Sequence, residues 1–442
     1  MKEFNWRFAF LIGFTGLVSV TFWPVFNTYV PIFLQAGHPL WEGATDASRA
    51  QVMGFALSPA LAYFIMTWDN LLHIFLTPWA GSKSDRTWNR FGRRLPWLLV
   101  GLPIALIGFV FIPYATSLAA IMLFILLTNL GTGIYRAPLR AWLGDFFLPA
   151  DRPKADSAGS FLAGMAVVVV FLIGGPMFDR ISRSAPFWLA AFIVLLGTVT
   201  ILLFVREEKD LGTSGTSPQL VAKQCTWREV VVQMFRSPER NVLWAFLGTF
   251  FLIAAHASYE AGVGSFGVFE LNITAGRVSQ LVGMAALLYI LLTIPAGVLA
   301  ARFGPRRVMM IGTLLYATAN FSTGLFARSE GVFFILLLVH GSLLPLIFVN
   351  NLTLFLNTDQ GHNTGVFTGL YFVAFQLAGV VGPLLTGAFI QLAGTQRMMW
   401  YVAGTCMTVA FLCISRVTER DFRKIKAVKN LGETTIAKHK NR

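Results

Sequence analysis

The stretch WDNLLHIFLTPWAGSKSDRTWNRFGRRLPW, from Trp68 to Trp97, decides how this chain folds. An apolar run that contains one carboxylate, Asp69, ends in a dense basic segment, and a new apolar run follows. An acidic residue at the centre of a membrane helix costs roughly 2.5 to 3.5 kcal/mol on insertion scales, and the basic segment is too charged to enter hydrocarbon. The pattern predicts the end of one transmembrane helix, a water-facing hairpin and the start of the next helix.

The composition of the whole chain agrees with this interpretation. Of the 442 residues, 55% are hydrophobic and only 13% are charged, with a mean hydropathy of +0.65, whereas soluble globular proteins carry about 25% charged residues. We therefore predict an all-α polytopic membrane protein in contact with the lipid bilayer. The net charge of +14 lies between apolar runs rather than along one face, which argues against a nucleic-acid partner. The three cysteines lack metal-ligand spacing, so we expect neither a metal nor a cofactor.

Apolar runs of about 20 residues mark twelve expected transmembrane helices. Most of the 35 Lys and Arg residues fall on alternate connections, which predicts a multi-pass protein of the plasma membrane, the inner membrane in a bacterium, with both termini cytoplasmic. The expected helices cover residues 8–34, 52–80, 95–115, 118–144, 158–178, 186–205, 242–268, 279–301, 306–327, 331–357, 364–392 and 398–416.

A hydrophilic connection divides these helices six and six. It begins with DLGTSGTSPQ, the composition of a flexible linker, and continues with a segment near Trp227 and Phe235 whose apolar residues share one helical face, as in a helix that lies in the membrane interface. We expect four parts: a six-helix bundle at 1–205, the linker with its interfacial helix at 206–240, a second bundle at 241–417 and a basic cytoplasmic tail at 418–442.

Three signals recur in the same order in both bundles: an Arg-Phe-Gly motif, an acidic residue after the fourth helix and a Gly-Pro pair in the fifth. They stand at 90–94 and 302–307, at Asp145 and Asp359, and at 175–176 and 382–383. Such repetition predicts two pseudo-symmetric bundles with a substrate site between them near the membrane midplane.

The segment GSKSDRTWNRFGRRLP, at 81–96, together with the preceding Trp68-Asp69-Asn70, resembles the major facilitator superfamily. More narrowly, it is similar to the glycoside-pentoside-hexuronide cation symporters and the related sucrose-transporter branch, whose second pattern matches YRAPLRAWLGDFFLPADR at 135–152. The resemblance implies the major facilitator fold and cation-coupled transport of a sugar by alternating access.

The chain departs from that branch at its cation site. Melibiose-type members carry further acidic residues one and two turns beyond the position of Asp69, where this chain has His73 and Thr77. Because sodium prefers several oxygen ligands, this departure favours a co-transported proton over sodium. The second half also has Ala301 where an equivalent of Asp85 is expected.

Three residues are candidates for proton coupling: Asp69, Glu260 and His256. Charged groups inside membrane helices are rare and usually functional. The alternative for Asp69 is a structural ion pair with Arg136, and His256 and Glu260, one helical turn apart, can equally pair for structure alone.

Neutral hydrogen-bonding groups beside aromatic rings suit a small-molecule substrate, and a sugar in particular. His73 and His340 have the alternative of being ordinary hydrogen-bonded histidines within a bundle. The substrate-binding candidates are Trp23, Asn27, Asn70, His73, Asn129, Arg136, Tyr259, Asn350, Asn351, Tyr371 and Gln376.

The charged hairpin predicts a cytoplasmic gate, a latch of ion pairs that forms when the cytoplasmic side is closed. The alternative is simple positive-inside topology, which would not require the acids. The candidate gate residues are Asp85, Arg86, Arg90, Arg94, Arg140, Asp145 and Asp359.

We expect a secondary active transporter that couples sugar uptake to protons and functions as a monomer. Two alternatives remain: a proton-coupled exporter of amphiphilic compounds and a sugar receptor without net flux. An enzyme is not expected, because the chain lacks the H-E-x-x-H, G-x-S-x-G and G-x-x-x-x-G-K motifs.

Overall fold

The computed structural model describes residues 4–41, 54–148, 151–207, 240–356, 358 and 364–418. Its regular elements are helices, and eleven helical segments in these ranges are long and apolar enough to cross a membrane. The remaining expected span, the second in chain order, is present as two shorter helices, α4 and α5. The prediction of an all-α polytopic membrane protein is confirmed. The expected interfacial helix, the gate residue Asp359 and the tail beyond 418 lie outside the described residues.

The helix bounds agree with the expected ones to within a few residues, apart from the first span, which is two helices that meet at Thr21, the second span, and an earlier start of the fifth. The first half contains α1 (Trp6–Val20), α2 (Phe22–Gln35), α4 (Pro59–Met66), α5 (Trp68–Arg86), α6 (Leu95–Phe111), α7 (Leu118–Phe146), α8 (Arg152–Arg180) and α9 (Ala185–Phe204). The second half contains α11 (Asn241–Ser265), the π-helical turn η4 (Phe266–Glu270), α12 (Ala275–Phe303), α13 (Pro305–Phe326), α14 (Glu330–Leu356), α15 (Thr364–Ala393) and α16 (Met398–Arg416).

The second span differs from the expected single helix at 52–80. It breaks at Thr67, whose N–H and hydroxyl both donate to the carbonyl of Phe64, at 3.0 and 2.7 Å. This tight turn ends α4 and starts α5. At its other end α5 continues to Arg86, so Asp85 lies on the last helical turn and not in a loop. The side chain of Arg94 holds that turn by bonding Ser84 and Asp85 at 2.5 and 2.6 Å.

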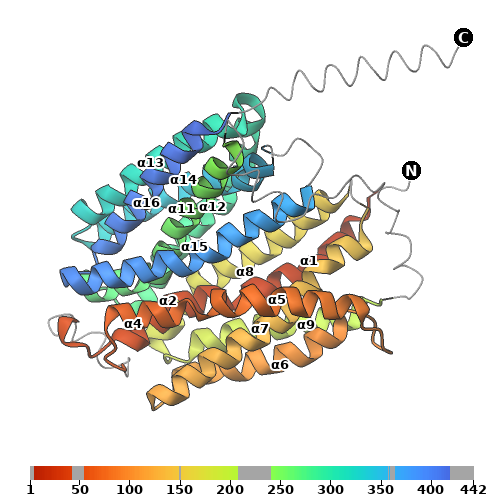
Figure 1. Ribbon diagram of the computed structural model, residues 1–442. Helices are drawn as coiled ribbons and strands as arrows, with labels where there is room; N and C mark the ends of the chain where they lie inside the picture. Colours follow the sequence, from red (N-terminus) through yellow and green to blue (C-terminus); the bar gives the residue numbers. More distant parts are fainter. Residues whose placement is uncertain are drawn as a thin grey trace, which may run out of the picture.

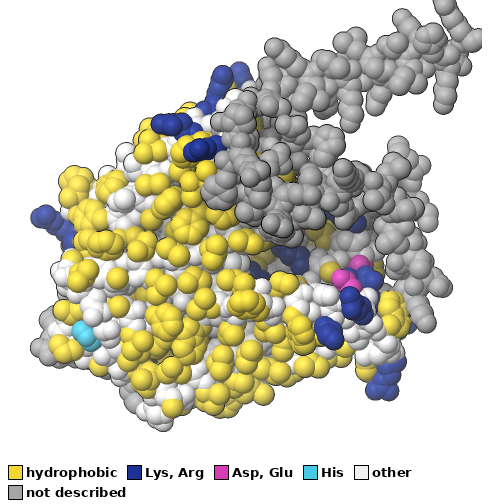
Figure 2. Space-filling model, viewed as in Figure 1, with side chains coloured by type: hydrophobic (Ala, Val, Ile, Leu, Met, Phe, Trp, Pro, Cys, Tyr) yellow, Lys and Arg dark blue, Asp and Glu magenta, His cyan; other side chains and the backbone are white. Residues whose placement is uncertain are grey.

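The helices form two bundles that lie side by side (Figure 1). Helix α8 packs along α12, α2 along α11, and α4 and α5 along α15. A continuous apolar core runs through the first bundle and on into the second, where it includes Tyr259, Phe266 and Trp400. On the face that Figure 2 shows, most of the surface of the described helices is apolar, and Lys and Arg gather mainly near the end where the chain termini lie in Figure 1.

We call the end where α1 begins and α16 ends the terminal end, and the opposite end the distal end. The hydrogen bonds that join the two bundles, within the described ranges, lie in the distal half. They are Gln35–Ser265, Gln35–Gln396, Tyr63–Gln396, Ala60–Gln391, Asn70–Gly379, Asp179–Thr274, Asp179–Gly276 and Phe171–Ser279. Toward the terminal end the two bundles diverge (Figure 1). The carrier is thus closed distally.

Candidate functional site

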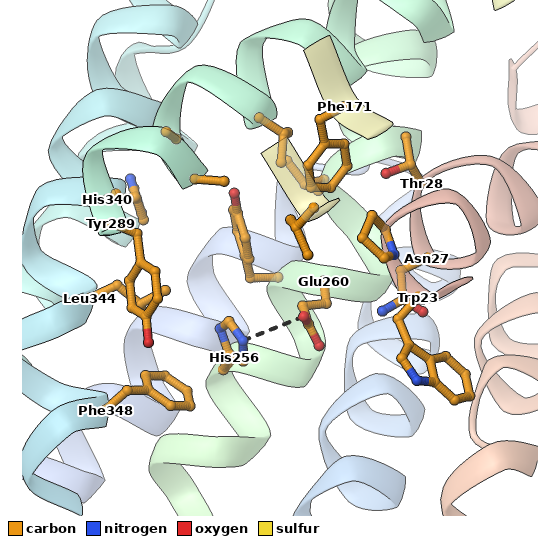
Figure 3. Close-up of a pocket in the computed structure, with 18 of the residues that line it drawn as sticks. Trp23, Asn27, Thr28, Phe171, His256, Glu260, Tyr289, His340, Leu344 and Phe348 are labelled. Carbon is orange, nitrogen blue, oxygen red and sulfur yellow. Dashed lines mark ion pairs between the residues drawn. The ribbon is translucent and has the colours of Figure 1, made fainter. Parts of the chain in front are cut away.

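A cavity of about 280 Å³ lies between the two bundles, below the distal seal. The first bundle contributes residues of α1, α2 and α8, and the second contributes residues of α11, α12, α13 and α14. Most of the wall is aromatic or aliphatic. Figure 3 shows the aromatic side chains around it, among them Trp23, Phe171, Tyr289 and Phe348.

Glu260 on α11 brings a carboxylate to this cavity. Its side chain is 49% exposed, and its Oε1 lies 3.5 Å from Nε2 of His256, one helical turn earlier (Figure 3). Nδ1 of His256 is buried and has no hydrogen-bond partner in the described part of the chain. Among the described lining residues Glu260 is the one acid. The pair can therefore hold a proton next to whatever occupies the cavity.

Aromatic rings of the cavity wall pack around the Glu260–His256 pair. The ring of Tyr259 is stacked on that of His340, with centroids 6.1 Å apart, and His256 meets the ring of Phe348 at 4.6 Å. His340 is buried and its Nδ1 lies 2.8 Å from the carbonyl of Leu336. It is the hydrogen-bonded bundle histidine that the alternative interpretation expects, and it also lines the cavity.

Asp69 and Arg136 lie beside the cavity, in the first bundle. Oδ1 of Asp69 accepts a hydrogen bond from Asn70 at 2.8 Å. Arg136 is within electrostatic range of both Asp69 and Glu260, but among the described residues no ion pair joins Asp69 to Arg136. The guanidinium carbon of Arg136 lies 5.8 Å from the ring centre of Trp23. Arg136 also lines a second cavity of about 120 Å³ that opens between α1, α7 and α8.

The structure divides the expected substrate-binding residues into two groups. Trp23, Asn27 and Tyr259 line the central cavity, as do the coupling candidates His256 and Glu260. The rest do not line it, because their helices turn those faces toward neighbouring helices or toward the second cavity. They are Asn70, His73, Asn129, Arg136, Asn350, Asn351, Tyr371 and Gln376.

The local contacts explain this second group. His73 is buried and its Nε2 lies 3.1 Å from the carbonyl of Asn129. In the second bundle, Asn351 accepts from Thr249 at 3.0 Å and lies 3.4 Å from the hydroxyl of Tyr371. The backbone carbonyl of Asn129 and the side-chain amide of Asn351 therefore join helices within a bundle. Among the cavity residues that sequence reasoning missed are the Phe and Tyr residues Phe171, Tyr289, Tyr316 and Phe348, because an aromatic residue in an apolar helix carries no signal of which way it faces.

The candidate gate residues cluster at the terminal end of the first bundle. Arg94 is buried and binds Asp85 at 2.6 Å and Asp145 at 3.0 Å, and Arg93 binds Asp145 at 2.5 Å. Arg140 instead pairs with Asp156 at 3.5 Å. Arg86 and Arg90 are exposed. The Asp85 and Asp145 pairs are therefore present while the terminal ends of the bundles are apart, and they clamp α5, α6 and α7 of one bundle together.

Glu207 completes this cluster and was missed by sequence reasoning. It follows α9 directly and accepts hydrogen bonds from the backbone N–H groups of Arg93 and Arg94 and from the indole of Trp142. The available signal was its place immediately after an apolar span, opposite a basic hairpin. Within the described part of the chain, no group of three or more His, Cys, Asp or Glu residues is placed to hold a metal ion.

Comparison with known proteins establishes the family. The profile of the Major Facilitator Superfamily matches residues 8–270 and again 263–439. The chain belongs to this superfamily. It is accordingly a multi-pass membrane transporter of the secondary type and not an enzyme.

Sequence alignments with curated relatives extend over most of this chain. It is 23% identical to the class B tetracycline resistance protein of Escherichia coli, over 78% of this chain and 82% of the relative. It is 27% identical to the uncharacterized MFS-type transporter YuxJ of Bacillus subtilis, over 79% and 92%. The chromaffin granule amine transporter of Rattus norvegicus is 23% identical, over 78% and 63%.

Solved structures share the fold. A peptide transporter POT superposes with a TM-score of 0.69 at 15% identity, over 92% of this chain and 94% of that chain. A bacterial homologue of the lysosomal transporter Spinster, in an inward-facing and unoccupied conformation, gives 0.69 at 15% identity, over 94% and 98%.

Proposed function

We propose that this superfamily member is a proton-coupled exporter of amphiphilic organic cations. The observation that carries the proposal is the central cavity, whose aromatic and aliphatic wall contains one carboxylate, Glu260, among its described residues. The faces of aromatic rings attract cations, and a carboxylate gives a cation its counter-charge. An apolar wall suits the rest of an amphiphilic molecule.

Exchange follows from the single carboxylate. The Glu260–His256 pair accepts either a proton or the positive charge of the substrate, and the two compete for one site. If the carrier changes between its two open states with either a proton or a substrate bound, but not with both, it exchanges one for the other. One pH unit across the membrane then supplies about 1.4 kcal/mol, which equals a tenfold substrate gradient for one-to-one exchange.

The curated relatives support export over uptake. Two of them are, by name, a tetracycline resistance protein and an amine transporter, and none of the relatives described above is a sugar carrier by name. The resemblance to the glycoside-pentoside-hexuronide branch rests on Trp68-Asp69-Asn70, on the charged hairpin and on 135–152, and none of these segments is among the described lining residues of the cavity.

Sugar symport is the second candidate. Trp23 and Asn27 place one flat ring and one amide on the cavity wall, a combination that binds sugars. The wall otherwise offers few of the several donors and acceptors that sugar hydroxyls require.

Purified protein in acid-loaded proteoliposomes tests the proposal. We expect accumulation of ethidium, an aromatic monocation, driven by the outward proton gradient, and a loss of at least about tenfold in Glu260→Gln, which removes the titratable charge. Glu330→Gln is the matched control, because Glu330 is an acid paired with Arg277 at the distal edge, away from the cavity. In vesicles with the reverse, inward proton gradient, accumulation of sucrose or melibiose, together with no ethidium transport in the acid-loaded vesicles, would establish the second candidate instead.

Asp69 is the alternative coupling residue, and the same vesicles separate it from Glu260. If Asp69 couples the proton without binding the substrate, Asp69→Asn abolishes gradient-driven accumulation but leaves ethidium exchange between loaded and external pools. If Glu260 is the shared site of proton and substrate, Glu260→Gln reduces both accumulation and exchange. A variant that keeps uphill transport identifies its acid as structural.

A further inference from the structure

A chain of side-chain hydrogen bonds crosses between the two bundles at the distal end. The hydroxyl of Tyr63 donates to Oε1 of Gln396 at 3.3 Å, Nε2 of Gln396 donates to Oε1 of Gln35 at 2.9 Å, and Nε2 of Gln35 donates to Ser265 at 3.1 Å. Tyr63 and Gln35 belong to the first bundle, and Gln396 and Ser265 to the second. All four side chains are fully buried. We call these four residues the distal latch.

Gln396 is held in place by an ion pair within its own bundle. It lies in the turn between α15 and α16. Its backbone N–H and the hydroxyl of Thr395 both donate to Oε2 of Glu270, at 3.1 and 2.8 Å. Arg397 binds the other oxygen of Glu270 at 2.9 Å and the carbonyl of Gly324 at 2.9 Å. Glu270 therefore ties this turn to the end of η4, and Arg397 ties it to α13.

The chemistry of the latch suits reversible opening. A buried amide that loses its partner costs about 1 to 3 kcal/mol, whereas a made hydrogen bond contributes only about 0.5 to 1.5 kcal/mol over bonds to water. When the distal end opens, water can replace every partner in the latch. When it closes, Gln396 must return to a geometry that satisfies its neighbours in the other bundle, or the buried groups remain unpaired.

We propose that Glu270 and Arg397 are positioning residues of the transport cycle, which set the place of Gln396 so that the distal gate can close on Gln35 and Tyr63. Neither residue is among the described lining residues of the central cavity. The proposal goes beyond the proposed substrate and direction, since an importer and an exporter must both close this gate. Weakening the ion pair loosens Gln396 and shifts the carrier toward its distally open state.

Site-specific labelling tests this shift without any substrate. In a background without Cys225, Cys406 and Cys413, the reporter Thr28→Cys lines the cavity beneath the distal seal, where Thr28 is 2% exposed. A membrane-impermeant maleimide added on the distal side reaches it only through an open gate. We expect Glu270→Gln to raise its labelling rate about five- to thirty-fold, the population change that one or two kcal/mol produces.

A second reporter separates positioning from general loss of structure. Ser160→Cys lines the second cavity near the terminal end, and its labelling from the terminal side should fall in Glu270→Gln as distal labelling rises. The control Gln391→Ala removes a bond to Ala60 across the same interface, at 3.3 Å, from an exposed side chain, and should label like the parent. Unchanged labelling in Glu270→Gln, or a rise at both reporters, would overturn the proposal.

A double-variant cycle checks that Gln396 is the point of action. Gln396→Leu leaves the buried Oε1 of Gln35 without its hydrogen-bond donor, so it should favour the open gate. Gln35→Leu combined with Gln396→Leu removes both partners, which is far less costly than removing one. We therefore expect the double variant to label more slowly at Thr28→Cys than Gln396→Leu alone. Additive effects of the two substitutions would contradict a direct contact in the closed state.

Discussion

Arg94 shows how one side chain organises the terminal end of the first bundle. Its guanidinium bonds Ser84, Asp85 and Asp145, which lie on α5 and α7, while its own backbone precedes α6. Burial lowers the pKa of Arg94, but its bonds to Asp145 and then to Asp85 outweigh burial and raise it. The residue is therefore a permanent cation that holds three helices together. The expected role of this cluster as a cytoplasmic gate stays a prediction.

Replacing Arg94 leaves Asp145 without a buried partner, so we expect Arg94→Leu to be destabilising. Breaking a buried ion pair by removing one partner costs roughly 3 to 5 kcal/mol, and the lower end applies because Asp85 is 59% exposed. Thermal unfolding in detergent measures the loss. Arg140→Leu, which removes an exposed pair with Asp156, should change stability by less than about 1 kcal/mol. Equal effects of the two substitutions would refute this assignment.

At the scale of elements, the N-terminus of α12 is hydrogen-bonded by a residue of the other bundle. Asp179, near the end of α8, accepts hydrogen bonds from the hydroxyl of Thr274 at 2.6 Å and from the N–H of Gly276 at 3.1 Å. Thr274 is itself the N-cap of α12. A negative charge at a helix N-terminus is stabilising, and here it stabilises the contact between bundles as well as the helix.

Asp179→Asn keeps an acceptor oxygen at this position but removes the charge. A charge at a helix N-terminus contributes about 0.3 to 1 kcal/mol, so we expect a two- to five-fold gain in distally open carriers, measured as labelling of Thr28→Cys from the distal side. Asp156→Asn, a partly exposed acid at the terminal end, should leave that labelling unchanged. A decrease in labelling for Asp179→Asn would mean that the carboxylate favours the open state.

At the scale of the whole molecule, the distal seal depends on close approach of backbones. An added Cβ at Gly276, on α12, would lie 2.1 Å from the carbonyl oxygen of Gly175, on α8. The collision involves backbone atoms of two bundles, so neither can give way unless the bundles separate. The seal is therefore sensitive to one methyl group at this point.

Gly276→Ala should consequently trap the carrier distally open and reduce transport by at least about tenfold. Gly331→Ala is the matched control: both glycines are the second residue of a helix, but a Cβ at Gly331 meets nothing within 4 Å. Double electron–electron resonance between spin labels on the distal ends of α4 and α15 reports the separation of the bundles. A distance distribution unchanged from wild type in Gly276→Ala would contradict the prediction that the added methyl group separates the two bundles.

The number, order and limits of the helices were readable from the residues alone. Whether a segment of about 20 residues enters a bilayer depends on its own composition, which is why eleven spans fall near their expected limits and why the repeated motifs announce two bundles. The helix break at Thr67 was not predicted, because a hydroxyl that bonds a carbonyl of its own helix does not change the hydropathy of the segment.

Only the tertiary structure decided which face of each helix points toward the cavity and which helices it packs against. Glu260 and Asn351 look alike in sequence, as polar residues in apolar helices, yet one faces the cavity and the other joins helices within a bundle. The distal latch is the clearest case: Gln35 and Gln396 are 361 residues apart, and neither stands in a motif. Hydropathy is a property of one segment, whereas a buried hydrogen bond is a property of two, and only their packing brings them together.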